Sequence, residues 1–256
     1  MKAQQYTETR PAEHFTRFHE RVRGQRAGWT YEFVRMVLTP YLMLFFRARS
    51  IDAHRVPAFG PAIVAPNHFS FLDHFFVAIY LRRKMQFMAK SQLFKPPMQF
   101  VYSHGGVFPV RRGHRDEEAF VTARTILERG GVVLMYAEGG RSRTGDLGEP
   151  KAGLGRLALE TGVPVVPTAI AGSAKVRNWK RLQFPKVTMQ FGDPLRFEAV
   201  DGPTRDQAQA ASEVVFEHIR TLYGGLQHGG RRRAVAAARA ARRAARSGAG
   251  ARPATD

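Results

Sequence analysis

Short runs of β-branched and apolar residues alternate with longer helical patterns along most of the chain. The runs are IVA, QFMA, VFPV, VVLMYA, VVPTAI and VTMQF, which begin at residues 63, 86, 107, 132, 165 and 187. This alternation is typical of a mostly parallel sheet with helices on both faces. Between two runs, residues 116–129 start with acids and end with Arg before two glycines, which predicts a crossover helix. The sequence therefore predicts the α/β fold class, with a mostly parallel sheet flanked by helices.

Composition narrows the chemistry that such a sheet can carry. None of the 256 residues is a cysteine, which excludes a disulfide scaffold, a thiolate metal site and a cysteine nucleophile. The formal net charge is +19, from 40 Lys and Arg against 21 Asp and Glu. We therefore expect an anionic partner: nucleic acid, an anionic lipid surface or a phosphorylated substrate.

We divide the chain into three parts. Residues 1–50 are a basic, amphipathic segment, residues 51–228 are the α/β domain, and residues 229–256 are a tail rich in Arg and Ala. The tail holds eight Arg and one Asp, and its only large apolar residue is Val235, so we expect a disordered, solvated arm, with a helix on a surface as the alternative. A helix over about residues 204–223 is expected to close the domain, and the glycines at 224 and 225 to release the arm.

The N-terminal part raises the question of membrane contact. Its first 15 residues have no apolar stretch beside their charges, so we expect neither a secretory signal nor a transit peptide, and a cytoplasmic protein. Residues 33–46 (FVRMVLTPYLMLFF) are too few to span a bilayer, and arginines flank them on both sides. Three uses stay open: a buried first helix, an apolar face among lipid headgroups with cations on the phosphates, or the wall of an acyl pocket.

Polar residues gather in the loops that follow three of the runs, where ligands bind in parallel sheets. The first of these loops, residues 67–74, follows the IVA run. A helix beginning near Phe69 or Ser70 would place Asp73 about one turn into that helix, where its carboxylate can reach back to His68. A carboxylate on one imidazole nitrogen leaves the other free to take a proton from a hydroxyl, which makes His68 a candidate general base. Capping or packing is the alternative. We expect no metal, because the spacing of His68, Asp73 and His74 suits a metal site poorly.

The loop at residues 138–142 (EGGRS) is suited to binding an anion. Gly139 and Gly140 let backbone N–H groups approach a ligand, and Arg141 and Arg143 supply charge and forked sets of donors. Glu138 can orient an arginine by pairing with it. Phosphate is the expected guest, and the alternative is an exposed turn with solvated charges.

Two cations follow other strands and join this list, Lys90 after QFMA and Arg111 after VFPV. Serine hydrolase chemistry is disfavoured, because GRSRT at residues 140–144 lacks the last glycine of G-x-S-x-G and the informative histidine lies seventy residues before Ser142. No P-loop and no G-x-G-x-x-G occur, so nucleotide hydrolysis and dinucleotide redox have no support.

Four blocks, taken together and in order, resemble the glycerolipid acyltransferases of the 1-acylglycerol-3-phosphate acyltransferase type. NHFSFLD at residues 67–73 resembles the NH-x4-D block, GGVFPVR at 105–111 the G-x5-R block, EGGRS at 138–142 the EGTRS block, and VPVVPTAI at 163–170 the V-P-V-x-P-V block. The resemblance covers roughly residues 30–200. Gly140 in place of threonine and Pro109 within the second block are departures, and neither removes a charged group.

The resemblance implies a glycerol-3-phosphate acyltransferase-like fold and an O-acyltransferase of phospholipid biosynthesis. His68 would deprotonate a glycerol hydroxyl and Asp73 would orient His68. The resulting alkoxide would attack a fatty acyl thioester of coenzyme A or acyl carrier protein, and no other cofactor is implied. The acceptor, 1-acyl-glycerol-3-phosphate, would become phosphatidic acid. Substrate-binding residues carried over in this way are Lys90, Arg111, Glu138, Gly139, Gly140, Arg141 and Ser142.

Two alternatives stay open. Another lysolipid or glycerol 3-phosphate can be the acceptor, because the blocks are shared across acceptors. A basic nucleic-acid-binding protein would use the arginine-rich tail, although no recognition motif is present and no specific nucleic acid is expected. For the acyltransferase, the expected partners are a lysophospholipid, the thioester donor and an anionic membrane surface, with peripheral or monotopic attachment to the cytoplasmic face of the cell membrane.

Overall fold

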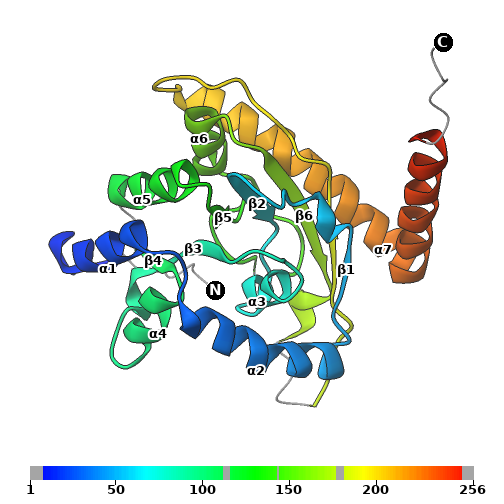
Figure 1. Ribbon diagram of the computed structural model, residues 1–256, viewed down its shortest axis with the longest axis horizontal. Coiled ribbons are helices and arrows are strands. Elements are labelled where there is room, and N and C mark those ends of the chain that lie inside the picture. The colour runs from blue at the N-terminus through cyan, green and yellow to red at the C-terminus, as the bar shows by residue number, and fades with distance from the viewer. Residues whose placement is uncertain (1–7, 112–115, 143, 177–181, 250–256) are drawn as a thin grey trace, which may run out of the picture.

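Helices and strands alternate along the chain, as Figure 1 shows. The structure is a computed structural model and describes residues 8–111, 116–142, 144–176 and 182–249. Its elements, in chain order, are α1 (Glu13–Gly24), α2 (Trp29–Phe45), β1 (Arg49–Ile51), η1 (Ala53–Arg55), β2 (Ala62–Pro66), α3 (Asp73–Ala78), β3 (Met85–Lys90), η2 (Ser91–Leu93), α4 (Met98–His104), β4 (Val107–Val110), α5 (Glu117–Glu128), β5 (Val132–Leu134), α6 (Ala152–Thr161), β6 (Val165–Ala171), β7 (Thr188–Phe191) and α7 (Arg205–Ala249).

The seven strands form one sheet in the order β1-β7-β6-β2-β5-β3-β4. Neighbouring strands run parallel except for β6 and β7. The predicted fold class, with a mostly parallel sheet, is therefore confirmed. Because β2, β5, β3 and β4 are parallel neighbours, the loops that follow them lie along one edge of the sheet.

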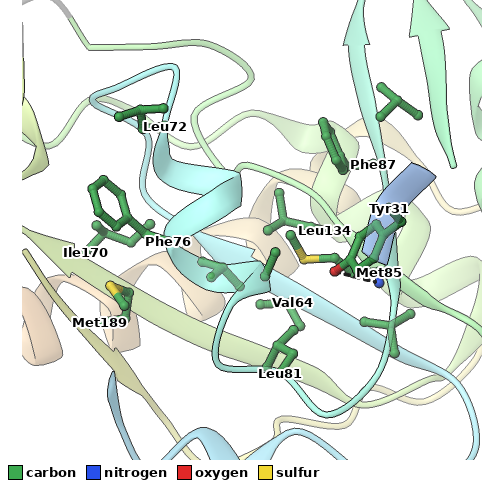
Figure 2. Packing of buried hydrophobic residues seen from close by; sticks show 14 of the residues in the cluster. Tyr31, Val64, Leu72, Phe76, Leu81, Met85, Phe87, Leu134, Ile170 and Met189 are labelled. Carbon is green, nitrogen blue, oxygen red and sulfur yellow. Dashed lines mark hydrogen bonds between the residues drawn. The ribbon is translucent and has the colours of Figure 1, made fainter. Parts of the chain in front are cut away.

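Alternate residues of each strand point to opposite faces of the sheet. In β2, Val64 belongs to the core of one face, and Ile63 and Ala65 belong to the core of the other. Helices α2 and α3 cover the first face, and α5, α6 and α7 cover the second (Figure 1). Figure 2 shows part of the first core, where the Tyr31 hydroxyl of α2 lies 3.4 Å from the backbone nitrogen of Met85 in β3.

The predicted strands and the predicted crossover helix are present, with small shifts at their ends. The VVLMYA strand stops at Leu134, because the residues after it turn into a loop. The helix expected over residues 116–129 is α5. Strand β1, which the sequence analysis does not predict, consists of Arg49, Ser50 and Ile51 and is held in the sheet by pairing with β7.

The N-terminal part forms two helices that use their apolar residues differently. Helix α1 buries Phe15, Phe18 and Val22 against α5, β4 and α4. Helix α2 buries Tyr31 and Leu42 and leaves most of its other apolar side chains exposed. No helix within the described residues combines the length and apolar character that crossing a bilayer requires.

The C-terminal helix contradicts two expectations. Helix α7 continues through Gly224 and Gly225, so the predicted release of the tail at these glycines is wrong. The predicted disorder of residues 229–256 is also wrong for residues 231–249, which are helical after a kink at Gly230. Residues 250–256 lie outside the described residues.

Tertiary contacts hold this last helical stretch in place. Val235 and Ala238 pack in a small apolar cluster with Ile51 of β1, and Arg242 donates to Asp52 Oδ1 at 2.6 Å. Alanine also has the highest intrinsic helix propensity. The composition correctly indicates that the tail cannot form a core by itself, but it does not reveal that β1 supplies the other half of the contact.

We predict opposite effects for two glycine substitutions on α6 and α7. A Cβ at Gly155 would lie 1.9 Å from the carbonyl oxygen of Ala208 in α7, whereas a Cβ at Gly224 would meet nothing within 4 Å. Gly155→Ala should lower the free energy of unfolding by about 3 kcal/mol, because α6 and α7 must separate. Gly224→Ala should raise it by up to about 1 kcal/mol through helix propensity. Urea unfolding measures both, and a destabilising Gly224→Ala would contradict a continuous α7.

Candidate active site

His68 and Asp73 follow β2, and their side chains meet in the loop before α3. His68 Nδ1 lies 2.9 Å from Asp73 Oδ2. The same oxygen accepts the backbone N–H groups of Phe69 and Ser70, each at 2.7 Å. Because Asp73 is fully buried, these three donors replace the water that its carboxylate has lost. The loop is therefore folded around one carboxylate oxygen.

The contact between His68 and Asp73 also sets the tautomer of the imidazole. An ionised carboxylate only accepts hydrogen bonds, so Nδ1 carries a hydrogen and Nε2 is the basic nitrogen. His68 is 9% exposed and lines a cleft. The structure thus brings together the two residues that the sequence analysis pairs, and their catalytic roles stay a prediction.

The helix after this loop begins later than expected. Helix α3 starts at Asp73 itself and not near Phe69 or Ser70. Asp73 turns its carboxylate back to the N–H groups of residues 69 and 70, and the Ser70 hydroxyl accepts the N–H of Leu72. These side-chain hydrogen bonds hold residues 69–72 in a turn, so the helix begins only at Asp73.

Two residues that the sequence analysis does not single out hold His68 in position. Tyr136 stacks on its imidazole, with ring centroids 3.7 Å apart and planes 14° apart. Asn67 is fully buried, and its amide exchanges two hydrogen bonds with the backbone of Ile170, at 2.7 and 3.1 Å. Asn67 lies within the NHFSFLD block, whereas the only signal for Tyr136 was its place just beyond a strand.

The loop after β5 is tied to the loop of His68. The N–H of Ser142 donates to the carbonyl oxygen of His68 at 2.8 Å. The N–H of Gly139 donates to the carbonyl oxygen of Tyr136 at 3.1 Å, and its φ of 63° lies in the left-handed region that glycine adopts readily. Both N–H groups are therefore occupied, and the expectation that Gly139 presents its N–H to an anion is wrong.

Gly140 and Arg141 present the remaining donors of this loop. Within the described residues, their backbone N–H groups have no hydrogen-bond acceptor. Burial lowers the pKa of His74 to about 3, and the charges of His68 and Arg141 lower it further to a smaller extent. Arg141 lines the same cleft as His68, so an anion bound there can meet its guanidinium.

Glu138 does not pair with Arg141 or with any other arginine in the described parts of the chain, which corrects the sequence expectation for these residues. Arg143 lies outside the described residues. Glu138 is 8% exposed, and Oε1 accepts the N–H of Gly148 at 3.4 Å. Burial raises the pKa of Glu138 to about 7, although backbone N–H groups of Gly148 and His68 act in the opposite direction. The carboxyl group lies underneath the loop and connects it to the segment around residue 148.

An apolar cleft of about 670 Å³ opens beside His68. Lys90 at the end of β3 and Arg141 after β5 join His68 in its lining. Side chains of α2, α3 and β3 form much of the rest, among them Tyr31 and Phe87, which Figure 2 labels. This volume lies in the range of small-molecule binding sites, and the mostly apolar wall suits a hydrocarbon chain.

The phenylalanines beside His68 divide between core and cleft. Phe69 and Phe76 are buried. Phe71 and Phe75 line the cleft instead. Phe75 and Phe76 are neighbours in α3, so one points to the cleft and the other to the core.

Several predicted binding residues lie outside this cleft. Arg111 follows the edge strand β4, and its Nε lies 3.9 Å from Asp116 Oδ2. Ser142 lines a second cleft on the side of α7. Of the predicted substrate-binding residues, Arg111, Glu138, Gly139 and Gly140 line neither cleft.

A family model described as Acyltransferase matches residues 47–171. This range contains the His68 and Asp73 pair and the loop at residues 138–142. Over this range, which is just under half of its length, the chain is similar to this acyltransferase family. The resemblance inferred from four sequence blocks is thereby confirmed.

Relatives within the acyltransferase family match only part of their own length. A chloroplastic 1-acyl-sn-glycerol-3-phosphate acyltransferase of Brassica napus is 33% identical over 119 residues, which cover 45% of this chain and 34% of that protein. The human 1-acyl-sn-glycerol-3-phosphate acyltransferase beta is 29% identical over 179 residues, 66% of this chain and 64% of that protein. The chain thus spans between about a third and two thirds of the curated relatives it matches.

A solved structure shows the same fold. The crystal structure of the 1-acyl-sn-glycerophosphate acyltransferase PlsC from Thermotoga maritima aligns with a TM-score of 0.58 and 21% sequence identity. The alignment covers 84% of this chain and 89% of that chain. The likeness therefore extends over most of both chains.

The raised pKa of Glu138 predicts how stability depends on pH. Between about pH 4.5 and 7 the folded chain keeps a proton on Glu138 that the unfolded chain loses. The free energy of unfolding should therefore fall as pH rises through this window, by up to about 3 kcal/mol. Glu138→Gln should abolish that part of the slope, which urea unfolding at pH 5, 6, 7 and 8 measures. An unchanged slope would show that burial does not shift this group.

Proposed function

We propose that this chain transfers a fatty acyl group from a thioester donor to the free hydroxyl of 1-acyl-glycerol-3-phosphate, giving phosphatidic acid. The observation that carries the proposal is the buried His68 and Asp73 pair at an apolar cleft whose lining also contains Arg141. The relatives named 1-acyl-sn-glycerol-3-phosphate acyltransferase support the same acceptor. The donor is acyl-coenzyme A or acyl carrier protein, and the reaction needs no other cofactor.

The chemistry follows from the tautomer of His68. Nε2 takes the proton of the acceptor hydroxyl while the hydroxyl oxygen forms a bond to the thioester carbonyl carbon. Asp73 stabilises the imidazolium through Nδ1, and two backbone N–H groups hold its carboxylate in place. The tetrahedral intermediate then expels the thiolate, which takes the proton back from Nε2. No acyl-enzyme forms.

Each part of the acceptor and donor has a place of matching chemistry. The acyl chain lies in the apolar cleft, where Phe71 and Phe75 are part of the wall. The phosphate of the acceptor binds the guanidinium of Arg141, which lines the same cleft as His68. Lys90 supplies a further cation in the same lining. A phosphate that stands next to His68 favours 1-acyl-glycerol-3-phosphate over lysolipids with a larger headgroup.

The outer face of α2 supports attachment to a membrane surface. Trp29, Met36 and Leu44 are 69%, 66% and 74% exposed, although α2 also lines the cleft through Tyr31 and Leu38. One helix therefore touches both the proposed acyl site and the surrounding medium. We propose peripheral attachment at the cytoplasmic face of the cell membrane, with the cationic surface on anionic headgroups.

The proposed reaction is tested by thiol release from palmitoyl-coenzyme A with 1-oleoyl-glycerol-3-phosphate in mixed micelles. His68→Ala should lower kcat by about 10³-fold, and Asp73→Asn should lower it by a similar factor because the amide no longer stabilises the imidazolium. Arg141→Ala should raise KM for the acceptor by about tenfold or more.

The matched control is Arg196→Ala, an exposed arginine beside the bridge between Leu195 and Val165 at the other end of β6. Its KM for the acceptor should stay at the parent value. Thermal unfolding shows that each variant is folded. A folded His68→Ala with parental turnover would overturn the mechanism, and a parent without acceptor-dependent release from either thioester would overturn the proposed function.

The membrane pose is tested by sedimentation with vesicles containing anionic lipid. Met36→Gln combined with Leu44→Gln should weaken binding at least tenfold, because two apolar side chains are lost from the buried face. Val121→Gln combined with Val214→Gln, on α5 and α7, makes the same chemical change at other exposed positions and should leave binding unchanged. Equal losses in both pairs would contradict a membrane face on α2.

A further inference from the structure

A second cleft lies on the other side of the His68 loop. Its volume is also about 670 Å³, and it runs between the ends of β6 and β7 and helix α7. Phe69 and Ser142 line it where it approaches the catalytic loop, and Ser142 is hydrogen bonded to the carbonyl oxygen of His68. Two clefts of equal size thus flank one catalytic residue.

The two clefts differ in chemistry. Lys175, Lys186 and Arg231 line the second cleft, with Asp146 as its one acidic residue. Within the described residues, none of these three cations forms an ion pair with a carboxylate. The hydroxyl groups of Ser142 and two threonines, at positions 144 and 188, add neutral donors. This lining suits a phosphorylated ligand.

Three hydrogen bonds hold the side chain of Arg231 in the wall of the cleft. Its Nε donates to Thr188 Oγ1, and its two terminal nitrogens donate to the carbonyl oxygens of Arg47 and Val187, each at 2.7 Å. These acceptors are neutral, so the guanidinium is held in place with its charge uncompensated. Burial, together with the charges of Arg49 and Arg47, lowers the pKa of Arg231, which marks a region of excess positive charge.

The kink at Gly230 explains why this arginine faces the sheet. Gly230 adopts φ 69° and ψ 166°, a conformation that side-chain-bearing residues avoid. The helix changes direction there, and Arg231 follows immediately, beside the start of β7 at Thr188. Gly172 fixes the other wall, because a Cβ at this position would lie 2.1 Å from the carbonyl oxygen of Lys186.

We infer that the second cleft binds the phosphate-bearing handle of the acyl donor, the phosphopantetheine arm that coenzyme A and acyl carrier protein share. This inference rests on the proposed function. The thioester joins an apolar acyl chain to a polar, phosphorylated arm, and the carbonyl carbon between them must lie at His68. The apolar cleft accepts the chain, and the cationic cleft on the opposite side of His68 accepts the arm. The phosphate of the acceptor still binds Arg141 in the apolar cleft, so the two phosphate groups have separate sites.

The test is the double variant Lys175→Gln with Lys186→Gln. Both lysines are exposed, so the fold should be unaffected. KM for palmitoyl-coenzyme A should rise at least tenfold, while kcat and KM for the acceptor stay at parental values. With palmitoyl-pantetheine, which has no phosphate, parent and variant should have the same KM.

Arg196→Gln with Arg205→Gln is the matched control. This control also removes two positive charges, but at exposed positions outside the cleft. Its KM for the donor should equal that of the parent. An equal rise in the control would show a general effect of net charge and would overturn the inference. An unchanged KM in the lysine variant with every phosphorylated donor would also overturn it.

Parallel assays with palmitoyl-coenzyme A and palmitoyl-acyl carrier protein distinguish the two sources of the arm. A rise confined to one of them supports the cleft as the site for that donor, and a rise with both supports the shared arm. Binding of free coenzyme A, measured by calorimetry on His68→Ala, does not depend on turnover. Binding that the two lysine substitutions abolish there would support the cleft as a phosphate site even if no acyl transfer is found. Binding that survives them would overturn the inference while leaving the proposed function standing.

Discussion

Asp73 Oδ2 accepts three hydrogen bonds, from His68 Nδ1 and from the N–H groups of Phe69 and Ser70, and the rest of the site depends on them. A buried carboxylate without such donors would cost several kcal/mol of folding free energy. The loop after β2 therefore has little freedom to change shape, and the imidazole is held in one tautomer. Asn67 fixes the start of the same loop by bonding to β6. Backbone groups therefore help to position His68, in addition to the Asp73 carboxylate.

The parallel sheet brings the loop of His68 together with residues that follow other strands. Strands β2, β5 and β3 end at the same edge, so His68, Arg141 and Lys90 meet there although they are far apart in the sequence. Helices α2 and α3 enclose an apolar cleft on one side, and α7 with the end of β7 encloses a cationic one on the other. A substrate that joins an apolar chain to a phosphorylated arm has complementary chemistry on both sides of His68.

Both ends of the chain take part in this arrangement. Helix α2 contributes Tyr31 to the wall of the apolar cleft and exposes apolar side chains such as Leu44 on its outer face. At the other end, Arg231 lines the cationic cleft, and Arg242 anchors the last helical stretch to Asp52. Composition describes these segments only as basic and amphipathic, because their partners lie far from them in the sequence.

The sequence by itself determined the sheet, the crossover helix α5, the pairing of His68 with Asp73 and the family, because these depend on local periodicity and short spacings. Tertiary structure alone decided the stacking of Tyr136 on His68, the separation of Arg111 from the apolar cleft and the ordering of residues 231–249. These features depend on which strands are neighbours and on contacts between segments far apart in the sequence. The spacing of residues along the chain specifies neither.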